Sequence, residues 1–156
     1  EQVNARFGSD TYRPIIFLRA HHEQDEIHRY YRAADVCYVS SLHDGMNLVA
    51  KEFVAARDDE AGVLVLSQFT GAARELTEAL VVNPYDLDEA SSALDAALSM
   101  SKSEQRDRMR FMRSLLSEFN VYRWAGRMIV DAAQLRRRER LSHRLRRKLL
   151  PAEAAK

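Results

Sequence analysis

The chain has 156 residues, enough for one domain of ordinary size with a buried core. Its 24 basic and 23 acidic residues nearly cancel, and the net charge of +1 argues against nucleic acid or a membrane surface as partner. The single cysteine, Cys37, excludes an internal disulfide and fits a reducing compartment. No apolar run reaches the roughly 20 residues of a membrane span and no signal peptide is evident, so we expect a cytoplasmic protein.

Short apolar runs alternate with helical patterns over the first two thirds of the chain. Four runs are predicted as strands: residues 14–18, 36–39, 63–66 and 79–82. The helices predicted between and after them cover residues 25–34, 47–56, a short stretch after 67–73, and 87–100, the last capped by Asp86. The runs are apolar without alternation, as in parallel strands covered on both faces. We therefore predict an α/β fold with right-handed βαβ units and a Rossmann-like parallel sheet.

The remainder of the chain is predicted to be helical. One helix is expected to begin at Ser103, and a long one is expected over residues 121–150. We divide the chain into a partial Rossmann-like domain, residues 1–120, and a long helix with a basic tail, residues 121–156. The arginine-rich tail favours a solvated helix end, with RNA or membrane binding as the weaker alternative. Four strands make a thin sheet, so we expect the chain to be a piece of a longer protein.

The most informative stretch follows the strand at 36–39. Asp44 and Gly45 predict a tight turn, and a mostly apolar helix that should be largely buried is expected from Asn47 onward. The free N–H groups at the start of that helix would make an anion site. Asp44 would lie before the helix and Glu52 two turns along it, roughly 12 Å apart. A nucleoside diphosphate sugar fits this layout, with hydroxyls at each end and the diphosphate between.

Each of these residues also has a structural explanation. Asp44 could cap the helix, Asn47 could be a turn residue, and Glu52 could pair with Lys51 or a distant arginine. The pair His21-His22 lacks companions at metal-ligand spacing, which favours a loop at a strand end. Since such loops bind ligands in α/β sheets, His22 remains a candidate contact to a base or sugar.

Other kinds of site are not supported. The chain has no G-x-G-x-x-G and no G-x-x-x-x-G-K-[ST] motif, so it lacks both a dinucleotide fingerprint and a P-loop. It also has no G-x-S-x-G nucleophile elbow, which leaves hydrolase chemistry without support.

Four stretches together resemble the trehalose-6-phosphate synthase family. They occur in family order over roughly residues 10 to 130, and they are residues 44–52, 63–76, 82–86 and 123–125. The resemblance implies the C-terminal, donor-binding half of a retaining glucosyltransferase of the GT-B fold. The expected donor is UDP-glucose or another nucleoside diphosphate glucose, and the expected product is trehalose-6-phosphate, made from glucose-6-phosphate in trehalose biosynthesis.

The resemblance also implies roles for individual residues. Asp44 is similar to the residue that holds glucose hydroxyls, and Glu52 to the one that grips the ribose. The other expected substrate-binding positions are the turn that meets the sugar, the helix start that receives the diphosphate, and a base contact: Gly45, Met46, Asn47, Leu48, Val49, Ala50, Lys51 and His22. The family's acceptor site and its phosphate-neutralising arginine and lysine lie upstream of Glu1.

The mechanism implied is front-face transfer in which the leaving phosphate assists deprotonation of the acceptor. It needs no protein nucleophile, no metal and no cofactor, so no catalytic residue is assigned in this half, which is expected to be inactive alone. Glucose-6-phosphate would bind through an N-terminal domain, and a homo-oligomer is left open. The alternatives are a glucosylglycerol-phosphate synthase and a non-catalytic, synthase-like regulatory module.

Overall fold

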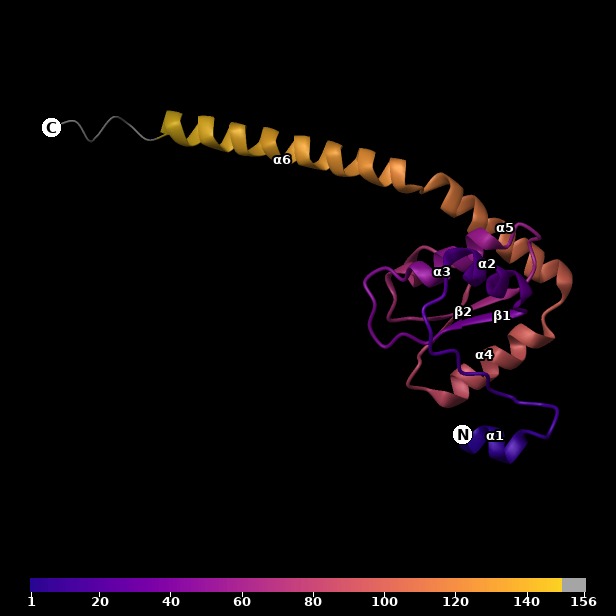
Figure 1. The fold of residues 1–156 in the computed structure, drawn as a ribbon. Helices are drawn as coiled ribbons and strands as arrows, with labels where there is room; N and C mark the ends of the chain where they lie inside the picture. The colour runs from indigo at the N-terminus through magenta and orange to yellow at the C-terminus, as the bar shows by residue number, and fades with distance from the viewer. Residues whose placement is uncertain (150–156) are drawn as a thin grey trace.

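The computed structural model describes residues 1–149, and the side chains of residues 1–142. Three parallel strands form one sheet in the order β1-β2-β3, with Val36 opposite Val63 and Val65 opposite Leu80. The strands are β1 Val36–Val39, β2 Val63–Ser67 and β3 Leu80–Val82. The helices are α1 Gln2–Phe7, α2 Gln24–Ala33, α3 Leu48–Ala56, the 3-10 turn η1 Gly71–Arg74, α4 Leu87–Ser99, α5 Lys102–Glu118 and α6 Val121–Leu149 (Figure 1).

Helices cover both faces of the sheet, as the uninterrupted apolar strands predict. Alternate residues of β2 point to opposite faces, and all five of its residues are buried. Leu64 and Leu66 join a core with Phe53 of α3 and Met109 of α5. Val63 and Val65 join a second core on the face covered by α4. The predicted parallel α/β sheet is therefore confirmed, and it is the frame that positions the loops at its carboxyl edge.

The prediction of a strand over residues 14–18 is wrong. This segment has no regular structure, and Ile16 and Phe17 are 75% and 80% exposed. Its backbone instead bonds a side chain: the Ile15 N–H donates to Oδ1 of Asn4, and the Ile15 carbonyl accepts from Nδ2, both at 2.8 Å. Apolar side chains favour burial of a segment, but a strand also needs a neighbouring strand with free N–H and C=O groups. The described sheet accordingly has three strands and not four.

Most predicted helix ends agree with the structure within two residues. Oδ1 of Asp86 accepts the N–H groups of Asp88 and Glu89 at 3.1 and 3.0 Å, so the predicted cap of α4 is confirmed. Helix α5 begins one residue before the predicted Ser103, because Oγ of Ser101 accepts the Glu104 N–H at 3.2 Å.

The charged connection after α3 contains a buried residue, Arg57, which is only 4% exposed. Its Nη1 donates to three carbonyls at the end of α2, those of Tyr31, Arg32 and Ala34, at 2.8, 3.0 and 2.6 Å. Its Nε and Nη2 bind the carboxylate of Asp59. Arg57 thus joins the end of α2 to the end of α3.

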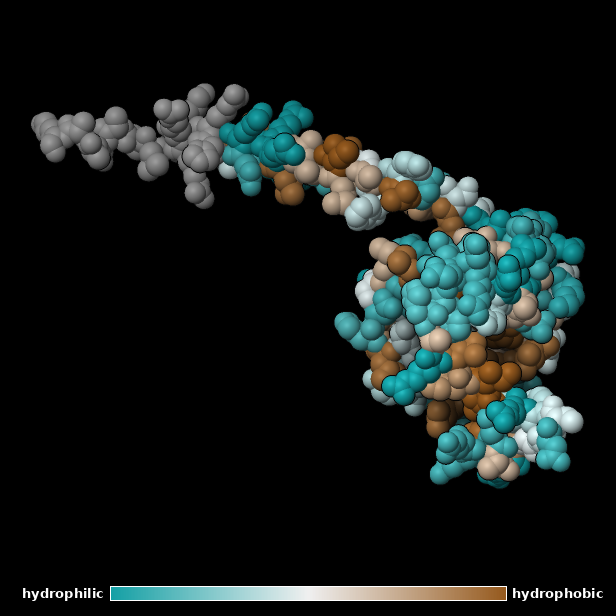
Figure 2. Space-filling model, viewed as in Figure 1, coloured by the Kyte–Doolittle hydropathy of each residue, from teal (hydrophilic) through white to brown (hydrophobic). Residues whose placement is uncertain are grey.

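Helix α6 extends away from the rest of the molecule (Figure 1). Apolar side chains along it are exposed, among them Trp124 at 57% and Ile129 at 71% (Figure 2). Within the part of the chain that the structure describes, no helix is long and apolar enough to cross a membrane. Of the predicted basic tail, the side chains of residues 143–149 and the whole of residues 150–156 lie outside the described residues.

Candidate functional site

The chain leaves β1 and turns at Asp44, as predicted. Oδ1 of Asp44 accepts the N–H groups of Met46 and Asn47 at 3.0 and 2.9 Å, and its Oδ2 accepts Nδ2 of Asn47 at 3.0 Å. These bonds, the one from the Met46 N–H first, lower the pKa of Asp44, so its carboxylate is ionised at neutral pH. Asp44 therefore shapes the turn, and the helix cap falls to another residue.

Asn47 is that cap. Its Oδ1 accepts the N–H of Ala50 at 2.9 Å, and its backbone has a positive φ of 69°. Asn tolerates this left-handed conformation better than most side chains do. The sequence places the special turn residue at Gly45, but the left-handed residue is Asn47. A Cβ on Gly45 would meet no atom within 4 Å, so the fold itself does not require glycine there.

The beginning of α3 is open to solvent. Leu48 and Val49 are 60% and 44% exposed, and their N–H groups precede any partner within the helix. The prediction of a largely buried helix is wrong for this first turn, although Phe53 and Val54 farther along are fully buried. An exposed helix start presents free donors and the positive end of the helix dipole, which suits an anion.

The loop after β2 supports the turn from behind. The Asp44 N–H donates to the Phe69 carbonyl at 3.1 Å, the Gly71 N–H to the Asp44 carbonyl at 3.1 Å, and the Ala72 N–H to the Met46 carbonyl at 2.8 Å. A Cβ on Gly71 would lie 2.1 Å from the Gly45 carbonyl oxygen. Sequence reasoning missed this support. The available signal was that the carboxyl ends of neighbouring parallel strands adjoin.

Glu52 and Lys51 have separate partners. The hydroxyl of Tyr31 donates to Oε2 of Glu52 at 3.2 Å, a contact that the sequence did not predict. Burial, and then the charge of Glu52, raise the pKa of Tyr31 to about 12, so the hydroxyl keeps its proton. Nζ of Lys51 lies 2.7 Å from Oε2 of Glu75 and ties α3 to the segment after η1. Among the residues whose side chains the structure describes, Glu52 therefore pairs with neither Lys51 nor an arginine.

Two predicted contacts are placed differently from the rest. Ala50 is fully buried and its N–H is capped by Asn47, so it offers a ligand neither its side chain nor its donor. Nδ1 of His22, in the loop before α2, lies 3.1 Å from Oε2 of Glu26 on that helix, and the buried Nε2 of His22 has no hydrogen-bond partner among the described residues. No described hydrogen bond links His22 to residues 44–52, and its contact to a base stays a prediction.

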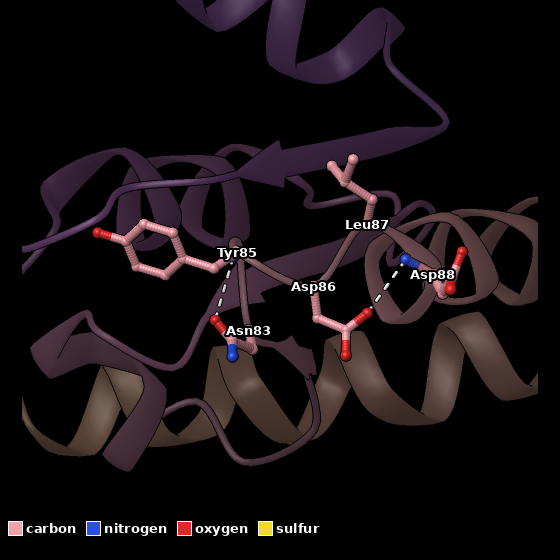
Figure 3. A pocket seen from close by; sticks show the side chains of 5 residues that line it. All are labelled: Asn83, Tyr85, Asp86, Leu87 and Asp88. Carbon is pink, nitrogen blue, oxygen red and sulfur yellow. Dashed lines mark hydrogen bonds between the residues drawn. The ribbon is translucent and has the colours of Figure 1, made fainter.

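A shallow depression of about 540 Å³ lies beside this turn, at the start of α4 (Figure 3). Its lining contains none of the predicted site residues: Asn83, Tyr85, Asp86, Leu87 and Asp88. The rings of Phe69 and Tyr85 meet at 5.8 Å and connect it to the loop behind Asp44. Its two aspartates would repel a diphosphate, so the depression does not suit the predicted anion. Within the described residues, no group of three or more His, Cys, Asp or Glu could hold a metal ion.

Comparison with known proteins decides the family. The model of Glycosyltransferase family 20 matches residues 1–134. The chain belongs to glycosyltransferase family 20. Within the family, a trehalose-6-phosphate synthase from Klebsiella pneumoniae is 46% identical over 149 residues, which are 95% of this chain and 31% of that protein.

Solved family 20 structures share the fold. The trehalose-6-phosphate synthase OtsA has a TM-score of 0.81 at 45% identity, covering 85% of this chain and 29% of OtsA. The enzyme from Burkholderia multivorans has a TM-score of 0.84 at 39% identity, covering 91% of this chain and 30% of its own. The predicted family and the Rossmann-like half of a GT-B fold are thereby confirmed. The chain spans about 30% of the length of these relatives.

Proposed function

We propose that this chain is the donor-binding part of a trehalose-6-phosphate synthase and binds UDP-glucose. The observation that carries the proposal is the open start of α3, with Asp44 before it and Glu52 one turn into it. Two family 20 structures support the ligand classes: one from E. coli is bound with UDP-2-fluoro glucose, and one from Burkholderia xenovorans is in complex with glucose-6-phosphate.

Each part of the donor has a matching group. The diphosphate is placed against the N–H groups of Leu48 and Val49, at the positive end of α3. Asp44 makes three hydrogen bonds within the turn, and a carboxylate offers about four acceptor positions, which leaves one for a glucose hydroxyl. Glu52 receives one bond from Tyr31 and keeps acceptor positions for the ribose hydroxyls.

The space beside Gly45 suits the approach of the sugar, since a Cβ built there would meet nothing within 4 Å. In this proposal, a helix start and basic side chains balance the charge of the leaving diphosphate, and no metal ion is needed. Glucose-6-phosphate would bind in a part of the longer protein that the relatives have and this chain does not span.

Titration calorimetry of UDP and UDP-glucose into the folded 156-residue chain tests the proposal. Glu52→Gln keeps the side-chain volume and should weaken UDP binding by about 1.5–3 kcal/mol, the usual contribution of hydrogen bonds to a charged group. A 2′,3′-dideoxy nucleotide should bind the variant and the parent chain equally. Glu104→Gln, which breaks the exposed pair with Arg108, is the matched control and should leave UDP affinity nearly unchanged.

The binding data give a coupling energy between residue 52 and the ribose hydroxyls. A melting curve of each variant measures its stability in parallel. A coupling energy near zero together with a lowered melting temperature would make Glu52 a structural residue. The absence of any binding heat with UDP at millimolar concentration, on demonstrably folded chain, would remove the donor site from the proposal altogether.

A further inference from the structure

Tyr31 lies where two helices meet, behind the carboxylate that we assign to the ribose. It belongs to the last turn of α2, and its hydroxyl is 3.2 Å from Oε2 of Glu52 on α3. Its ring meets the buried ring of Phe53 edge-on, with centroids 6.1 Å apart and planes at 79°. Nη1 of the buried Arg57 holds the Tyr31 carbonyl at 2.8 Å. Backbone and ring are therefore both fixed, and the hydroxyl has a defined position.

Glu52 needs such a support. It follows Leu48 by four residues, so both lie on the same face of α3 and the carboxylate lies below the open helix start. A glutamate side chain rotates about three bonds and has a large conformational entropy when nothing holds it. Immobilising it before the ligand arrives lowers the entropy lost on binding.

We propose that Tyr31 is a positioning residue that fixes one oxygen of Glu52 and thereby aims the other at the ribose hydroxyls of the donor. The inference rests on the proposed function, because it assigns a ribose to Glu52. The hydroxyl acts as a donor across the neutral pH range, since Glu52 accepts from it and burial keeps it protonated.

The test is Tyr31→Phe, which keeps the ring against Phe53 and removes only the hydroxyl. We expect UDP to bind the variant about 3- to 10-fold more weakly, the effect of freeing one side chain. Affinity for a 2′,3′-dideoxy nucleotide should stay as in the parent chain, and the melting temperature should fall slightly because the bond from the hydroxyl to Glu52 is lost. Tyr122→Phe is the control: Tyr122 is 84% exposed on α6 and has no role in the proposed site, so the loss of its hydroxyl should leave UDP affinity unchanged.

In the Glu52→Gln background, Tyr31→Phe should cause a clearly smaller loss of UDP affinity than in the parent chain. Unchanged or tighter UDP binding by Tyr31→Phe would overturn the inference. So would an equal loss for UDP and the dideoxy nucleotide, which would mark a packing role. If Glu52→Gln and removal of the ribose hydroxyls have no effect in the parent chain, the proposed function fails, and the inference fails with it.

Discussion

At the scale of single residues, the candidate site contains two kinds of group. Some side chains form hydrogen bonds with each other, and other groups face open space. Asp44 and Asn47 form hydrogen bonds with each other that hold the turn, and Asn47 also caps α3. Gly45 and the first residues of α3 face outward. The two glycines of the region consequently have different constraints: Gly71 is confined by the backbone of the turn, whereas Gly45 has free space around it.

Gly71→Ala should therefore lower stability, and Gly45→Ala should not. A Cβ at residue 71 would lie 2.1 Å from the Gly45 carbonyl oxygen, a backbone atom that moves only with the turn. We expect Gly71→Ala to cost about 1–3 kcal/mol of the free energy of unfolding, measured by urea titration. Gly45→Ala should keep that free energy and weaken UDP-glucose binding. Equal stability losses for the two variants would contradict this account of the turn.

The half-buried thiol of Cys37 should give the chain a measurable alkaline instability. Burial raises the pKa of Cys37 to about 11 from its ordinary value of about 8.5. Because the folded state favours the protonated thiol, this contribution is complete below about pH 8.5 and is lost as the pH rises toward 11. The stability of Cys37→Ala should fall less over that interval, measured by urea titration at several pH values. A parallel fall in both proteins would show that the thiol titrates normally.

At the scale of elements, the sequence predicts those strands, helices and caps that depend on patterns within a single segment. The three strands of the sheet, the helices after them and the Asp86 cap are all carried by apolar runs and capping residues, and all are confirmed. The run at 14–18 has the same local pattern but no strand beside it. The buried Arg57, the Gly71 support and the Tyr31 contact depend on residues 20 or more positions apart, which spacing alone does not reveal.

Arg57 gives the sharpest stability prediction at this scale. Arg57→Ala would leave three helix-end carbonyls without their donor and Asp59 without its partner, so we expect a loss of about 2–4 kcal/mol of unfolding free energy. Arg110→Ala is the control, because the side chains of Arg110 and Glu60 are 60% and 30% exposed and such pairs contribute about 1 kcal/mol or less. Similar melting temperatures for the two variants would refute the buried role of Arg57.

At the scale of the whole molecule, the chain matches only about 30% of the length of its family 20 relatives. The family resemblance implies that this part holds the donor site. Its sheet, α3 and α4 are packed around two hydrophobic cores. In the proposed function, the acceptor site lies elsewhere in the longer protein. Donor binding and sugar transfer should therefore be separable.

The purified 156-residue chain should form no trehalose-6-phosphate from UDP-glucose and glucose-6-phosphate, although we expect it to bind UDP. Chromatographic product analysis after long incubation measures this, with a full-length family 20 synthase as the positive control. Trehalose-6-phosphate made by the chain alone would show that the acceptor site lies within these residues.

The most direct test of the donor site is to map UDP onto the backbone amides by nitrogen-15 NMR titration of the folded chain. The account predicts that the largest and saturable shifts fall on Leu48 and Val49, where the open helix start would meet the diphosphate. Amides around the depression at residues 85–88 should move little, since its aspartates repel an anion. Shifts centred on residues 85–88, or none at residues 45–49 at saturating UDP, would contradict the account.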